Sequence, residues 1–167
     1  MSTTELQARG ATISDCARYR YSLWRRWADG PSLVFIGLNP STADADLDDP
    51  TIRRCVGFAK RDGYGGLHML NLYAFRSTDP KRVVEAEDAV GPDNDAALRE
   101  GTDAADVVAS WGAIHWSTIR ATRVLSMIDP KNLWCLGRTK HGHPRHPLYV
   151  KADRPLEPFG VSALRRS

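Results

Sequence analysis

Four short apolar runs alternate with segments of helical character along this chain. The runs are four to six residues long and rich in Val, Ile, Leu and Phe, which is typical of strands buried on both faces. Asp-Pro pairs at 49–50 and 79–80 indicate helix starts, because Asp caps a first turn and Pro is tolerated there. The predicted strands are Leu33–Leu38, Leu67–Leu72, Val107–Ser110 and Leu133–Leu136.

Strands separated by helices predict an α/β protein with three layers, α/β/α, and a central, mostly parallel four-stranded sheet. The clearest helices are Ile52–Arg61 and Ser117–Ile128, and two more begin near 79–80 and 91–93. The segment Cys16–Arg26 stays open. Its tyrosines alternate as in a strand, whereas Trp24 and Trp27 are spaced as on a helix.

Length and composition predict one domain over residues 1–167, with termini that fray. A hydrophobic fraction of 42% and a charged fraction of 26% are ordinary for a globular chain. Three cysteines without CxxC spacing argue against a disulfide framework or a zinc ribbon. No apolar run is long enough for a bilayer and no secretory leader is visible, so we expect a cytoplasmic monomer without a membrane partner.

Polar or small residues follow all four predicted strands. Gly37 and Asn39-Pro40 end the first, Asn71 lies at the end of the second, and Ser110-Trp111-Gly112 ends the third. The fourth runs into a loop, 137–149, that holds two His-Pro pairs. Because ligands of open α/β sheets bind at the carboxyl ends of the strands, we expect Asn39, Asn71 and His146 to line one cleft. Asn71 is equally compatible with a structural hydrogen-bonding bridge.

Charge is spread unevenly along the chain. Residues 107–167 hold ten Lys and Arg against three Asp and Glu, whereas residues 41–106 hold eight against fourteen. The basic C-terminal third predicts a wall of phosphate-binding residues formed by Lys140, Arg145 and Lys151. Four arginines at 18–26 alternate with aromatic residues, a pattern that suits nucleic-acid binding or a solvated basic face over buried aromatics.

In the order of its motifs, the chain resembles the uracil-DNA glycosylase superfamily. Gly37-Leu38-Asn39-Pro40-Ser41 resembles the family's first motif, and Met69-Leu70-Asn71 resembles the strand that bears the base-reading Asn. Val107–Gly112 resembles the apolar strand that ends in Gly, and His146-Pro147-Leu148 the last motif. A bacterial family to which no activity is attached is more similar still; it shares the Gly-Leu-Asn-Pro-Ser-Thr-Ala-Asp start and the Gly-x-Pro-x-His-Pro-Leu-Tyr end.

The resemblance implies an N-glycosylase that excises a modified or deaminated base. Asn39 would position the water, and His146 would donate to the base oxygen as charge develops. Leu148 or Tyr149 would fill the gap left by the extruded base. The implied partner is nucleic acid, DNA rather than RNA, or a free nucleotide, and no cofactor and no metal are expected. The implied substrate-binding residues are Gly37, Leu38, Pro40, Ser41, Asn71 and Tyr73, and those for nucleic acid are Lys140, Arg145, Leu148, Tyr149 and Lys151.

Two features depart from the family pattern. Asn39 stands where the family often has Asp, and Asn cannot act as a general base. The loop 41–49 is acidic and lacks the family's stacking aromatic, a role for which Tyr73, Phe75 and Phe58 are candidates.

The acidic loop leaves further alternatives open. Asp44, Asp46 and Asp48 alternate as at the start of a calcium loop, but the expected Gly and Glu are missing, and one or two of them would suit magnesium. The histidines at 141, 143 and 146 are a weaker candidate metal site. Three functions are therefore carried forward: an N-glycosylase, a non-catalytic nucleic-acid-binding module, and a carboxylate–metal phosphoesterase that uses residues 44–49.

Overall fold

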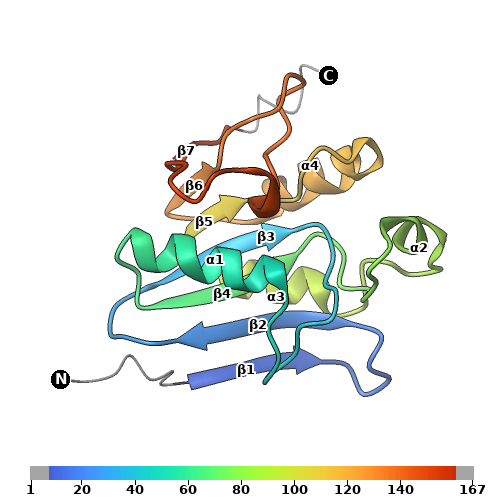
Figure 1. Ribbon diagram of the computed structural model, residues 1–167. Coiled ribbons are helices and arrows are strands. Elements are labelled where there is room, and N and C mark those ends of the chain that lie inside the picture. Colours follow the sequence, from blue (N-terminus) through green and yellow to red (C-terminus); the bar gives the residue numbers. More distant parts are fainter. Residues whose placement is uncertain (1–7, 161–167) are drawn as a thin grey trace.

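The structure, a computed structural model, describes residues 8–160, so the expectation of frayed termini falls outside the described part. Within that part, seven strands form one sheet in the order β1-β2-β4-β3-β5-β6-β7 (Figure 1). Three neighbouring pairs are parallel and three are antiparallel. The strands are β1 (Ala8–Ile13), β2 (Arg20–Arg26), β3 (Ser32–Gly37), β4 (Gly66–Asn71), β5 (Asp106–Ala109), β6 (Asn132–Cys135) and β7 (Glu157–Pro158).

The α/β class is confirmed, but the predicted width of the sheet is wrong. The four predicted runs coincide with β3, β4, β5 and β6, which are neighbours and parallel to one another. The sheet gains three more strands because β1 and β2 pair antiparallel beside β4, and β7 pairs antiparallel with β6. Of the segment Cys16–Arg26, which the sequence leaves open between strand and helix, residues Arg20–Arg26 form strand β2.

Helices cover both faces of the sheet. The α-helices are α1 (Pro50–Arg61), α2 (Pro80–Glu85), α3 (Asn94–Thr102) and α4 (Thr118–Met127), and the 3₁₀ turns are η1 (His115–Ser117) and η2 (Pro147–Tyr149). Both predicted Asp-Pro starts are confirmed: Asp49 accepts from the N–H of Ile52 and Asp79 from that of Lys81. None of the helices within residues 8–160 is both long and apolar enough to cross a membrane.

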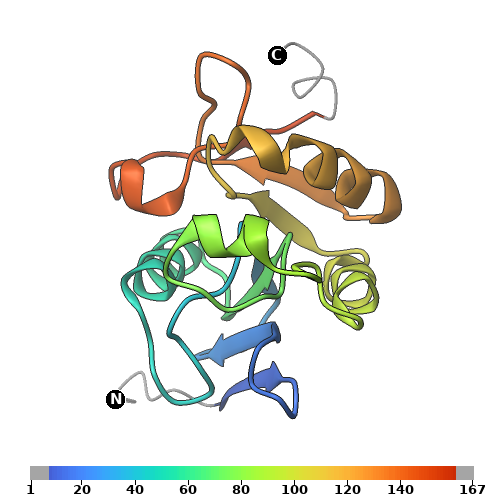
Figure 2. The same cartoon turned by 90° about the vertical axis from the view of Figure 1, so that its right-hand side faces the viewer.

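Two apolar cores lie on opposite sides of the sheet. Alternate residues of β3 illustrate the division, because Phe35 packs toward α1 whereas Ile36 packs toward α3 and α4. Figure 2 shows α1 and η2 on one side of the strands and α3 and α4 on the other. The inner strands are therefore buried on both faces, which explains their continuous apolar character.

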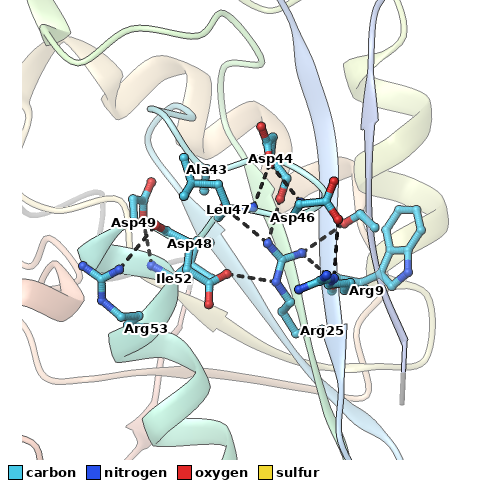
Figure 3. Close-up of polar contacts among 12 residues, drawn as sticks. Arg9, Arg25, Ala43, Asp44, Asp46, Leu47, Asp48, Asp49, Ile52 and Arg53 are labelled. Carbon is cyan, nitrogen blue, oxygen red and sulfur yellow. Dashed lines mark hydrogen bonds and ion pairs between the residues drawn. The ribbon is translucent and has the colours of Figure 1, made fainter. Parts of the chain in front are cut away.

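The acidic loop before α1 is held by arginines of β1 and β2 (Figure 3). The Arg25 side chain is almost fully buried; its Nε donates to Asp48 at 2.9 Å and its Nη2 to the carbonyl of Asp44 at 2.7 Å. Arg9 pairs with Asp46 at 3.4 Å on the surface. Asp44 accepts from the backbone N–H groups of residues 46 and 47, which lowers its pKa. The loop is thus a folded support for the start of α1.

Replacing Arg25 by Met is expected to destabilise the protein by about 2–4 kcal/mol, because buried carbonyls and the Asp48 carboxylate lose their donor. Replacing Arg9 by Met removes a contact to the same loop but an exposed one, with an expected loss below about 1 kcal/mol. Urea denaturation of both variants measures the difference. Equal stabilities would contradict the supporting role of Arg25.

Candidate functional site

A cleft of about 480 Å³ opens at the carboxyl ends of the parallel strands, the edge that faces the viewer in Figure 2. Its walls come from the loops after β3, β4 and β5, from the N-terminus of α1 and from the segment 139–149. Asn39, Asn71 and His146 therefore lie in one cleft, as the strand ends predict. Ten predicted site residues line it: Gly37, Leu38, Asn39, Pro40, Ser41, Asn71, Arg145, His146, Leu148 and Tyr149.

Asn39 is held by its amide nitrogen. Nδ2 donates to the carbonyl of Ser77 at 2.9 Å and to that of Pro40 at 3.1 Å. Because both partners are carbonyl oxygens, only the NH₂ group can face them, and the orientation of the amide is fixed. No hydrogen bond among residues 8–160 uses Oδ1, so an acceptor is left for a ligand or a water.

Asn71 lies in the floor of the cleft and is 2% exposed. It pairs with Gly37 across β3 and β4, where a Cβ on residue 37 would lie 2.8 Å from the Asn71 Oδ1. Gly37 thus makes room for this carboxamide. The Asn71 carbonyl accepts from the Nδ2 of Asn94 at 3.1 Å, which fixes the backbone, while the Nδ2 of Asn71 has no partner in the described residues.

His146 presents one defined ring nitrogen to the cleft. Its Nδ1 accepts from the backbone N–H of Leu148 at 3.1 Å and so caps η2. A neutral imidazole that accepts at Nδ1 carries its proton on Nε2, which leaves Nε2–H as a donor. Burial lowers the pKa of His146, and the carboxylate of Asp49 partly opposes this shift. The neutral form with Nε2–H is therefore favoured at neutral pH.

Three predicted residues lie outside the cleft lining. Tyr73 was expected to bind substrate, but its N–H donates to the carbonyl of Leu38 and its ring packs 5.5 Å from that of Trp116, on the α4 side of the sheet. Lys140 and Lys151 are exposed residues that flank the cleft-lining segment without lining the cleft. The predicted basic wall beside the cleft thus has one member, Arg145, in the lining itself and two exposed members next to it in the chain.

The aromatic residues of the cleft also differ from those expected to stack on a base. Phe58 is a residue of α1 that is buried in the core, and Phe75 packs edge-on against Tyr19. The cleft lining instead contains Trp111 and Tyr149, and the ring of Tyr149 lies 5.4 Å from that of His146. Tyr149 is 80% exposed, so one aromatic face stands open at the mouth.

Two charged residues of the cleft were not expected there. Asp49 lies in the lining as well as capping α1, and Arg20 reaches the lining from β2 with 2% of its surface exposed. The sequence contains both, Asp49 as a helix cap and Arg20 in the arginine–aromatic cluster. Their convergence depends on β2 pairing with β4, an antiparallel contact with no local sequence signal.

No group of three or more potential metal-ligating side chains occurs within residues 8–160. The carboxylates at 46 and 48 face arginines, and those at 44 and 49 accept from backbone N–H groups. Each acidic side chain of this loop therefore has a partner from the protein itself.

The comparisons with known proteins give one family. No curated protein and no solved structure gives a significant match to the chain. A family described as "Protein of unknown function (DUF1643)" matches residues 20–148, a span that runs from Arg20 to Leu148 and includes almost all of the cleft lining. The chain belongs to the DUF1643 family.

Proposed function

We propose that the chain is a uracil-DNA glycosylase-like N-glycosylase that releases a modified or deaminated base from nucleic acid or from a nucleotide. The observation that carries the proposal is the meeting of three groups in one cleft: the Nε2–H of His146, the open Oδ1 of Asn39 and the buried carboxamide of Asn71. The parallel strands β3, β4, β5 and β6 are neighbours, and the cleft lies at their carboxyl ends. This arrangement supports the proposal of a uracil-DNA glycosylase-like fold.

Hydrolysis of an N-glycosidic bond breaks the bond between the sugar C1′ and the base nitrogen. The bonding electrons stay with the base, which departs as an anion, and positive charge builds on the sugar. The Nε2–H of His146 stabilises the growing charge on a base oxygen. Oδ1 of Asn39 accepts a hydrogen bond from the attacking water and so positions that water. The water oxygen forms the new bond to C1′, and its proton is released to solvent or to the base.

Asn71 reads the base. A carboxamide offers one donor and one acceptor side by side, which matches the edge of a base that carries an N–H next to a carbonyl. To reach a floor this buried, a base must leave the stack. Leu148 and Tyr149, exposed at the mouth beside His146, are placed to occupy the gap.

His146→Ala is expected to slow single-turnover base release by about a hundredfold or more, because it removes a preorganised donor to the leaving group. His141→Ala is the matched control, since His141 is an exposed histidine of the same loop outside the cleft lining. A His146→Ala protein that releases base at the wild-type rate would contradict the assignment. A wild-type protein that binds oligonucleotides but releases no base would identify a binding module instead.

Asn39→Ala and Asn71→Ala are expected to have different effects on the rate of base release. Loss of Asn39 misplaces the water and slows release of every base, whereas loss of Asn71 relaxes the choice among bases, because reading an edge is a specificity term. Rates on a panel of uracil, hypoxanthine and xanthine substrates separate the two effects. Parallel losses on all substrates for both variants would contradict a reading role for Asn71.

The rate of base release is expected to fall as the pH falls between about pH 8 and pH 5, the range in which histidines titrate. Burial lowers the pKa of His146, so the midpoint of the loss lies on the acid side of that of an ordinary histidine. Protonation of Nδ1 breaks the bond from the Leu148 N–H that orients the ring. A pH–rate profile tests this, and a rate that rises toward acid pH would show that the imidazolium is the active form.

Arg145, a basic residue of the cleft lining that comes from the segment 139–149, is placed to contact a phosphate of the nucleic-acid backbone. Arg145→Ala is expected to weaken oligonucleotide binding and to reduce the slope of log K against log salt by about one. The control is Arg123→Ala, which removes an exposed arginine of α4, on the far face of the sheet. An unchanged salt slope in the Arg145 variant would place the phosphate contacts elsewhere.

A further inference from the structure

Several residues that line the cleft carry a buried N–H donor without a partner in the described part of the chain. Five buried side-chain nitrogen or oxygen atoms lack a hydrogen bond among the described residues. Three of them belong to residues that line the cleft, and all three are donors: Nε of Arg20, Nδ2 of Asn71 and Nε1 of Trp111. Buried polar groups are rarely left unpaired. Three such donors on residues of one cleft favour a ligand that supplies acceptor oxygens.

Arg20 is the charged member of this set. Its Nη1 donates to the carbonyl of Ala43 at 3.0 Å, and this is its one side-chain hydrogen bond among residues 8–160. None of the ion pairs in that part of the chain includes Arg20. Burial lowers its pKa to about 10, against the favourable field of Asp49, so the guanidinium remains charged at neutral pH.

The other two buried arginines have carboxylate partners. Arg25 donates to Asp48 at 2.9 Å, and Arg120 donates to Asp95 at 2.6 Å and to the carbonyl of Leu72 at 2.8 Å. Both therefore have structural roles that account for their burial. Arg20 is as buried as Arg25 but has no carboxylate partner within residues 8–160. A buried charge without an ion pair is costly, and it is accounted for when a bound ligand supplies the opposite charge.

The sheet order places Arg20 at a definite side of the cleft. It comes from β2, which neighbours β4, whereas Asn39, Trp111 and His146 follow β3, β5 and β6 on the other side of Asn71. A ligand that reaches from His146 across Asn71 thus presents its far edge to Arg20. This inference rests on the proposed function for the identity of the ligand as a base or nucleotide.

We propose that Arg20 is a specificity-determining residue that binds an oxyanion of the ligand next to the edge read by Asn71. Two sources share this chemistry: a carboxylate or similar oxyanion substituent on the base, or the phosphate of a nucleotide. Arg suits either, because its planar fork donates two parallel hydrogen bonds to such a group.

Calorimetric titration with matched neutral and anionic ligands tests the proposal. The probes are uracil against 5-carboxyuracil, and uridine against uridine 5′-monophosphate. Wild type is expected to bind the anionic member of one pair at least tenfold more tightly. The pair that shows the preference identifies the source as the base substituent or the phosphate.

The same titrations on variants test whether Arg20 causes the preference for the anionic ligand. Arg20→Met is expected to abolish it, and Arg20→Lys, which keeps the charge but loses the fork, to retain part of it. The control Arg54→Met removes an arginine of α1 that donates to the carbonyl of Val150 outside the cleft lining, and it is expected to keep the full preference. Thermal unfolding verifies that the variants are folded. Arg20→Met is expected to lower the midpoint, because the buried carbonyl of Ala43 loses its donor, so affinities are compared at temperatures below the onset of its unfolding.

Equal affinities within both pairs, absence of binding by all four probes, or an unchanged preference in Arg20→Met would each overturn the proposal. These readouts need no turnover. A protein that prefers the anionic ligand through Arg20 but releases no base would therefore refute the N-glycosylase alone, and one that releases base without the preference would refute the role of Arg20 alone.

Discussion

The cleft is organised around one close contact, between the carboxamide of Asn71 and the backbone of Gly37. The two residues face each other in the β3–β4 ladder, and a side chain at position 37 would collide with the Asn71 oxygen. Because position 37 has no Cβ, a polar group can lie in the floor between two apolar strands. The carbonyl of Asn71 is fixed from the opposite face by Asn94, and that of Leu72 by Asn94 and Arg120. Two helices of the same layer, α3 with Asn94 and α4 with Arg120, thus hold this strand end.

The inner part of the sheet follows directly from the sequence, because strands buried on both faces must be continuously apolar. The outer part does not. Residues of β2 alternate between buried and exposed, and its arginines and aromatic residues fit a strand or a helix equally well. β7 consists of two residues and carries no periodic signal. The predicted four-stranded sheet was therefore too narrow, although the order of elements along the chain was right.

Residues of the cleft lining could be predicted where they lie at the end of a parallel strand or in the loop after it, and could not where they come from elsewhere. Asn39, Asn71 and His146 belong to the first group. Tyr73 also follows a strand, but Leu72 before it is buried in the core on the α4 side. The Tyr73 ring packs against that same core and against Trp116. Arg20 belongs to the second group. Nothing in an arginine-rich segment distinguishes a buried guanidinium from a solvated one, so its burial becomes visible only when β2 is placed beside β4.

The hydrogen bond that caps η2 links the imidazole of His146 to the exposed turn at the mouth of the cleft. The N–H of Leu148 holds the Nδ1 of His146, so the proton on the imidazole and the position of the exposed Leu148–Tyr149 tip are set by one hydrogen bond. If the tip is pulled away from the ring, that bond is lost and either tautomer becomes accessible. Loss of this one bond would therefore remove the preference for a proton on Nε2, the ring nitrogen that the proposed mechanism uses as its donor.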